Sequence, residues 1–87
     1  MREYEFGGLV QSMAGHDKGE LFVILDVQGE ILLLADGKYR TVEKPKRKKI
    51  KHVQYMNYRC SRLIEEKEKS GRVTNEMIKY ELKNLCL

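Results

Sequence analysis

Short runs of apolar residues separated by glycines occupy the first part of the chain, and this pattern predicts β-structure. We expect strands at residues 9–13, 20–27 and 30–35, where branched and large apolar side chains recur. The run ELFVILDV at 20–27 has too many consecutive apolar residues for a strand with one wet face, so we predict a central strand buried in part on both faces. Gln28-Gly29 is predicted to be the two-residue hairpin turn before the third strand.

Two further strands are predicted after these. Asp36-Gly37 supplies the residues with positive φ that a type I′ turn needs, so we predict that residues 39–42 return as a fourth strand. Pro45 interrupts the pattern, and residues 49–53 are predicted to form a fifth strand. Five short strands predict a mainly β fold with a C-terminal helix, built on a small Src-homology-3-like barrel, because closure hides the sheet edges. An open sheet packed by the C-terminal helix is the alternative.

After residue 56 the spacing of apolar residues becomes helical. Ser61 is predicted to cap a helix that ends at Ser70-Gly71, and Thr74 to cap a second helix with Glu76 in its first turn. We expect the apolar stripe of the second helix to pack on the barrel or to dock a partner; its members are Met77, Ile78, Leu82 and Leu85. The predicted division is a barrel over residues 1–56 and a helical extension over 57–87.

The segment GLVQSMAGHDKGELFVILD, residues 8–26, carries the most informative motif. Between two predicted strands lies a loop, residues 12–20, in which Gly15 and Gly19 tolerate the positive φ of a tight turn. Its exposed donors suit phosphate better than covalent chemistry. The segment resembles the KOW motif of ribosomal proteins and transcription elongation factors, in the residues Val10, Gly15, Lys18, Gly19, Val23 and Ile24. The resemblance implies a small barrel that binds RNA or a ribosomal or transcriptional partner.

The order of a KOW-like barrel, a basic stretch and a threonine-capped helix resembles the archaeal and eukaryotic large-subunit ribosomal protein fourteen family. It is still more similar to the compact bacterial KOW-domain RNA-binding proteins grouped with that family. The resemblance implies that the loop faces ribosomal RNA, with contacts at Ser12, Gly15, His16, Lys18 and Gly19. Because Asp17 and Glu20 flank the one lysine of the loop, we expect phosphate binding there to rely on backbone N–H groups and on Lys18.

Charge is distributed unevenly along the chain. Residues 1–43 hold 4 basic and 8 acidic residues, a formal charge of −4, whereas residues 44–87 hold 13 and 5, a formal charge of +8. The densest segment is KPKRKKIKH at 44–52, which we predict to be a mobile basic loop, kept out of helix by Pro45, leading into a strand. A phosphate backbone relieves repulsion in such a segment, so we predict RNA contacts at Lys44, Lys46, Arg47, Lys48, Lys49 and Lys51. An ordinary solvated surface is the alternative.

Aromatic residues near these charges have two interpretations. Tyr39 lies between Lys38 and Arg40, and Tyr55 and Tyr58 follow the basic segment. Such rings stack on unpaired bases in RNA-binding proteins. The alternative is that they cover the barrel ends and keep their hydroxyl groups in water.

Signatures of other function classes are missing from the sequence. No catalytic arrangement, phosphate-binding P-loop or metal-ligand spacing is present, so we expect no enzymatic activity, no cofactor and no metal. Cys60 and Cys86 are expected to be reduced, with a disulfide between them as the alternative. The sequence has neither a signal peptide nor an apolar run of about 18 residues, so we expect no membrane partner and a cytoplasmic location.

These features together predict an RNA-binding protein, ribosomal or ribosome-associated, that works in translation as part of a ribonucleoprotein. We expect it to contact structured ribosomal RNA (rRNA) through the loop and the basic segment, mainly at phosphates, so that RNA shape rather than base sequence selects the site. Ribosomal proteins are further expected partners, and the free chain is expected to be a monomer. The alternative is a protein–protein interaction module of the transcription or translation machinery that docks through the barrel or the C-terminal helix.

Overall fold

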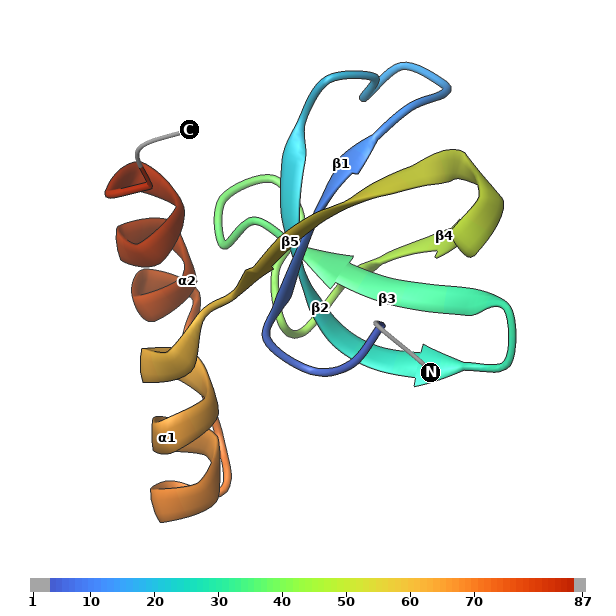
Figure 1. Cartoon of the computed structure of the whole chain (residues 1–87). Helices are drawn as coiled ribbons and strands as arrows, with labels where there is room; N and C mark the ends of the chain where they lie inside the picture. The colour runs from blue at the N-terminus through green and yellow to red at the C-terminus, as the bar shows by residue number, and fades with distance from the viewer. Residues whose placement is uncertain (1–3, 86–87) are drawn as a thin grey trace.

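A computed structural model describes residues 4–85 and has a mainly β architecture with two helices beside the sheet (Figure 1). The strands form one antiparallel sheet in the order β4-β3-β2-β1-β5. The elements, in chain order, are β1 (Gly8–Ser12), β2 (Leu21–Gln28), β3 (Ile31–Ala35), β4 (Lys46–Lys49), a short 3₁₀ helix η1 (Ile50–His52), β5 (Val53–Arg59), α1 (Ser61–Ser70) and α2 (Asn75–Lys83).

The predicted mainly β fold with five short strands and a C-terminal helix is confirmed. The pairing register shifts at Ile24/Asp26 in β2, and again where Gly8 and Val10 of β1 face the longer stretch from Arg59 to Tyr55 of β5; such bulges bend strands and increase their twist. The sheet curls into a small barrel-like shape but does not close, because β4 and β5 remain its two edges. The fold is therefore a small barrel-like sheet with two open edges, and the helices pack against its outer face.

The first three strands lie within one residue of their predicted positions. The hairpin between β2 and β3 also forms, but its closing pair is Gln28 and Ile31. Its two turn residues are therefore Gly29 and Glu30, one position later than predicted, and Gly29 takes the positive φ of 64° that the turn requires.

The predicted strand at residues 39–42 is wrong, because the carboxylate of Asp36 organises a different turn. Its Oδ1 atom accepts the backbone N–H groups of Lys38, Tyr39 and Arg40, each at 2.9 Å. An Asp side chain that takes these donors competes with a strand ladder for them. The segment therefore folds as a compact turn instead of a type I′ hairpin.

Contact with α2 holds this turn in place from the other side. Gly37 has a φ of +81°, and a Cβ atom there would collide with the backbone of Asn75 and with Lys79. The side chain of Asn75 also accepts the backbone N–H of Val42 at 2.8 Å. Only a glycine allows the start of α2 to approach the turn this closely.

The basic segment forms an edge strand, β4, and not the mobile loop that we predicted. Its four residues pair with β3, from Leu34 opposite Lys46 to Ile31 opposite Lys49. Residues 46–49 contain no apolar side chain, so hydrophobic alternation could not indicate a strand. The alternation is instead in burial, since Lys48 is buried while Arg47 and Lys49 are exposed. Charged side chains on an edge strand also oppose pairing with another molecule.

The predicted strand at residues 49–53 is wrong as well. Residues 50–52 form η1, and the strand that follows, β5, runs from Val53 to Arg59. The division that we predicted near residue 56 therefore falls inside β5.

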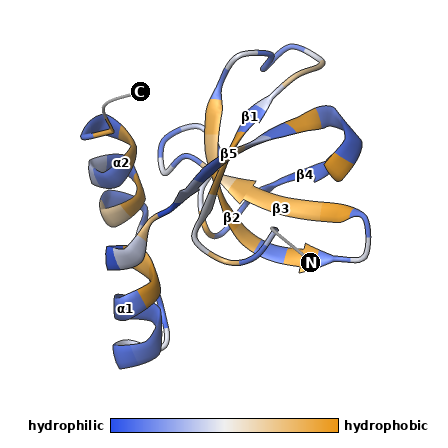
Figure 2. Cartoon of the chain, viewed as in Figure 1, coloured by the Kyte–Doolittle hydropathy of each residue, from blue (hydrophilic) through white to orange (hydrophobic). Residues whose placement is uncertain are grey.

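Two apolar clusters lie on opposite faces of the sheet, and alternate side chains of β2 contribute to each of them. The inner cluster fills the curl of the sheet and consists of Val10, Phe22, Ile24, Leu32, Leu34 and Val53. The outer cluster lies between the sheet and the helices and consists of Val23, Ala35, Cys60, Leu63 and Ile78. Figure 2 shows the apolar stripe of each helix on the side toward the sheet. The predicted burial of the central strand on both faces is confirmed.

The helix signals are confirmed with one exception. The hydroxyl of Thr74 accepts the N–H of Met77 at 3.2 Å, and Gly71 ends α1 with a φ of +84°. Ser61 is the first helical residue and not the cap; the cap position belongs to Cys60, which makes no side-chain capping bond. Neither described helix is long and apolar enough to cross a membrane.

Cys60 is positioned by a backbone hydrogen bond and by burial of its side chain. Its backbone N–H donates to the carbonyl of Gly7 at 2.8 Å, and its side chain is fully buried in the outer cluster. Burial, reinforced by nearby Glu81, raises the pKa of the Cys60 thiol to about 11, so the thiol stays protonated. Cys60 is a free cysteine. Cys86 lies outside the described residues, and with it the alternative of a disulfide.

The packing of α2 gives the first testable prediction. Ile78 is fully buried in the outer cluster, so Ile78→Ala should lower the free energy of unfolding by about 2–4 kcal/mol in a denaturant titration. Tyr80→Ala is the matched control on the exposed side of the same helix and should change it by less than about 0.5 kcal/mol. Equal stability of the two variants would show that α2 does not pack on the sheet.

Candidate nucleic-acid interface

The loop of residues 12–20 is closed by its own backbone between β1 and β2. Ser12 donates its N–H to the carbonyl of Glu20 at 2.9 Å, and Gly19 donates its N–H to the carbonyl of Ser12 at 2.8 Å. Gly15 and Gly19 have φ values of +88° and +93°, as expected for the glycines of a tight loop. The segment that resembles a KOW motif is therefore a compact strand–loop–strand unit.

This closure uses up part of the donor set that we expected to bind phosphate. The N–H groups of Lys18, Gly19 and Glu20 donate to carbonyls within the loop, and that of Met13 donates to the carbonyl of His52 at 2.9 Å. A phosphate could take these N–H groups only by opening the loop. The exposed side chains of His16 and Lys18 remain as outward donors of the loop.

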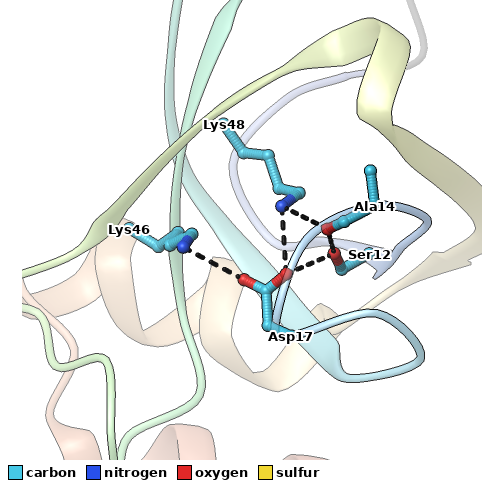
Figure 3. A network of polar contacts seen from close by, with 5 residues as sticks. All are labelled: Ser12, Ala14, Asp17, Lys46 and Lys48. Carbon is cyan, nitrogen blue, oxygen red and sulfur yellow. Dashed lines mark hydrogen bonds and ion pairs between the residues drawn. The ribbon is translucent and has the colours of Figure 1, made fainter.

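A network of polar contacts connects the loop to β4 through Asp17 (Figure 3). The ammonium group of Lys48 donates to Oδ1 of Asp17 at 3.0 Å and to the carbonyl of Ala14 at 2.9 Å. The hydroxyl of Ser12 lies 2.6 Å from the same Oδ1. Lys46 forms an ion pair with Oδ2 of Asp17 at 3.3 Å. We call Ser12, Asp17, Lys46 and Lys48 the Asp17 network.

The network keeps Asp17 ionised although it is largely buried. Its side chain is only 17% exposed, and that of Lys48 only 9%. Burial by itself would raise the pKa of Asp17, but contacts with Ser12, Lys48 and Lys46 outweigh it and hold that pKa well below its usual range. Two lysines share one carboxylate, so the network as a whole carries a charge of +1.

The six basic residues of the predicted contact set take different positions in the structure. Lys48 is buried and Lys46 is half-buried, because both point into the Asp17 network. The other four are exposed, and we call them the basic edge: Lys44, Arg47, Lys49 and Lys51. Successive side chains on a strand alternate between its faces, but β4 is the last strand of the sheet, so both faces border the same open edge.

A shallow depression that the sequence did not indicate lies between the loop of residues 12–20 and the turn that Asp36 organises. Phe22 contributes an apolar side chain to its lining. The other lining residues are His16, Asp17, Glu20, Asp36, Tyr39, Arg40 and Lys46. Residues from four separate parts of the chain meet here, which explains why no local motif predicted the site.

The role of Asp17 was also missed at the level of sequence. Asp17 looked unfavourable for phosphate binding, whereas in the structure it attaches the loop to the basic strand. Its partner Lys48 lies 31 positions away in the chain. The only local signal was the spacing of Lys46 and Lys48, which places both side chains on one face of a strand.

No protein-family model matches the chain, and no curated protein is significantly similar to it. The likeness to KOW proteins therefore rests on the residues of the loop and its two strands.

Removal of the Asp17 carboxylate is the second testable prediction. Asp17→Asn leaves the buried ammonium group of Lys48 without its counterion, so the free energy of unfolding at neutral pH should fall by about 2 kcal/mol. The control Asp26→Asn changes an exposed carboxylate of β2 and should have little effect.

The pH dependence of the stability difference between wild type and Asp17→Asn follows from the lowered pKa of Asp17. The folded protein holds fewer protons on this group than the unfolded chain, so its stabilisation is complete above the ordinary Asp pKa of about 3.9 and is lost as the pH falls below it. The stability gap between wild type and Asp17→Asn should therefore be constant from about pH 5 to 8 and narrow in more acidic solution. A gap that widens on acidification would contradict this account.

Proposed function

We propose that this protein binds structured RNA, with ribosomal RNA as the class of target. The loop of residues 12–20 and the basic edge would form one contact surface. The observation that carries the proposal is the Asp17 network, which attaches two segments that sequence analysis had singled out independently. Lys46 and Lys48, predicted as direct contacts, would then serve mainly to position the loop.

The electrostatic state of the basic edge supports this proposal. Within residues 4–85, none of its four side chains forms an ion pair, and the four lie close together in the chain. Four unpaired cations on or beside one edge strand repel one another. A phosphate backbone removes that repulsion and gains entropy by releasing its condensed counterions.

The geometry favours recognition of RNA shape. Long, flexible cations on an edge strand suit phosphates, which position a nucleic acid without specifying its sequence. The ribosomal target follows from the resemblance of residues 8–26 to KOW motifs, and a cytoplasmic ribonucleoprotein is the setting that such a target implies. The proposed protein binds RNA without catalysing a reaction, through Gly15, His16 and Lys18 of the loop together with the basic edge. Ser12 and Gly19, also predicted as contacts, would instead hold the loop closed, because Ser12 is buried and the N–H of Gly19 is bonded within the loop.

A protein-docking module remains the second hypothesis from sequence, and the packing of α2 bears on it. Ile78 is fully buried, and Met77 and Leu82 pack against the same outer cluster. Three of the four residues of the apolar stripe therefore pack toward the sheet, which leaves little of it as a docking face. RNA binding is the function that the exposed surface favours.

The third prediction tests the basic edge. If each of the four cations of the basic edge contacts a phosphate, they should contribute about −3 to −4 to the slope of the logarithm of RNA affinity against the logarithm of salt. The triple variant Arg47→Gln, Lys49→Gln, Lys51→Gln should make that slope less steep by about 3 and weaken binding at least tenfold, measured by fluorescence anisotropy.

A matched control separates position from net charge. Lys69→Gln, Arg72→Gln and Lys83→Gln remove the same three charges from exposed sites in the helical part. This control should nearly retain the wild-type affinity and slope. If it weakens binding as much as the edge variant does, only net charge matters and the proposed surface is wrong.

The fourth prediction concerns the loop. On addition of an rRNA fragment, the amide signals of residues 14–20 should shift in NMR spectra, because His16 and Lys18 are its outward donors. Lys18→Ala should leave the fold intact and weaken binding about threefold, consistent with the loss of one phosphate contact. Loop amides that stay unmoved while others shift would place the contact surface elsewhere.

A further inference from the structure

Tyr39 is displayed to solvent and does not cover an end of the barrel. Its side chain is 78% exposed, more than those of Tyr80 at 57% and Tyr58 at 40%. The structure therefore contradicts the interpretation that the ring of Tyr39 covers an end of the barrel. An exposed aromatic ring forgoes apolar burial and is accessible to a ligand.

The turn that carries Tyr39 is preorganised. The carboxylate of Asp36 accepts three consecutive N–H groups, and the N–H groups of Asp36 and Gly37 both donate to the carbonyl of Arg40 at 2.9 Å. Close contact between Gly37 and the start of α2 also holds the turn in place. A ring on a fixed turn loses little conformational entropy when a ligand stacks on it.

The charges around the ring suit a nucleotide. The ammonium group of Lys38 lies 5.1 Å from the centroid of the Tyr39 ring, and Arg40 follows directly in the chain. On the other side, the depression described above leads from Tyr39 to Lys46 and His16. Two of the carboxylates there are already engaged, Asp17 by lysines and Asp36 by N–H groups, which leaves Glu20 as the exposed acid.

We propose that Tyr39 stacks on one unpaired base of the bound RNA, while Lys38 and Arg40 hold the phosphates on either side of that nucleotide. This inference rests on the proposed function and narrows its target. Bases inside a duplex are stacked on one another, so a protein ring can reach only a bulged or looped-out base. The ligand class is therefore structured RNA with an unpaired nucleotide beside a helix.

Two RNA hairpins test the inference: one with a single-nucleotide bulge that carries the fluorescent base 2-aminopurine, and one without the bulge. Wild type should bind the bulged hairpin more tightly. Tyr39→Ala should lose about 5- to 100-fold of affinity for the bulged hairpin and keep its affinity for the paired one. With Tyr39→Ala bound, the 2-aminopurine should be more fluorescent than with wild type, because the ring no longer stacks on it.

Two further variants act as controls. Tyr39→Phe keeps the ring and should behave as wild type. Tyr80→Ala removes another exposed tyrosine beside a cation, since Arg62 lies 5.9 Å from its ring centroid, and should have no effect on either hairpin.

The outcomes separate this inference from the proposed function. If Tyr39→Ala binds both hairpins as wild type does, or weakens both equally, the stacking site is wrong. RNA binding through the basic edge would still stand in that case, provided that the triple variant of the basic edge binds both hairpins much more weakly than wild type does. If wild type binds neither hairpin, the proposed function and the stacking site both fall.

Discussion

The buried ammonium group of Lys48 needs a counterion, and the arrangement of the loop and the basic edge depends on this requirement. A cation that is 9% exposed costs several kcal/mol unless a counterion and hydrogen bonds compensate for its lost water. Asp17 and the carbonyl of Ala14 supply both, but only when the loop of residues 12–20 closes against β4. The requirement to satisfy one charge therefore sets the loop conformation and the position of the edge strand together.

The same constraint divides the basic side chains of residues 44–51 into a buried set and an exposed set. Because side chains alternate along β4, Lys46 and Lys48 turn toward Asp17, whereas Arg47 and Lys49 remain in solvent. The inward pair holds the loop, and the outward pair, with its neighbours Lys44 and Lys51, leaves four cations exposed to solvent. A contiguous run of charge is thus partly structural, and counting its members overstates the number of residues free to meet phosphate.

Sequence reasoning predicted the elements whose signals are local. The apolar run of β2, the glycines of the loop, the Thr74 cap and the stripe containing Ile78 all act within a few residues, and each was found. The errors at residues 39–42 and 49–53 have a different cause. Asp36 captures three N–H groups that a strand would have used, and β4 is ordered by pairing with β3 and by a carboxylate 31 positions away from Lys48. The bonds of Asp36 are local but compete with the strand pattern, whereas the long-range contacts of β4 leave no periodic trace in the sequence.

The candidate site was predicted as two separate segments and is better described as one composite surface. Its loop and its basic segment could be named from motif and charge, but their attachment and the depression beside Tyr39 arise only from the fold. No single stretch of sequence contains the residues that meet there.

Photo-crosslinking of the full chain to an rRNA fragment, followed by mass spectrometry of the linked peptides, tests this composite surface most directly. The account predicts links to the loop of residues 12–20 and to residues 44–51 in the same complex, with none to α1. Links confined to the helices, or to only one of the two segments, would contradict it.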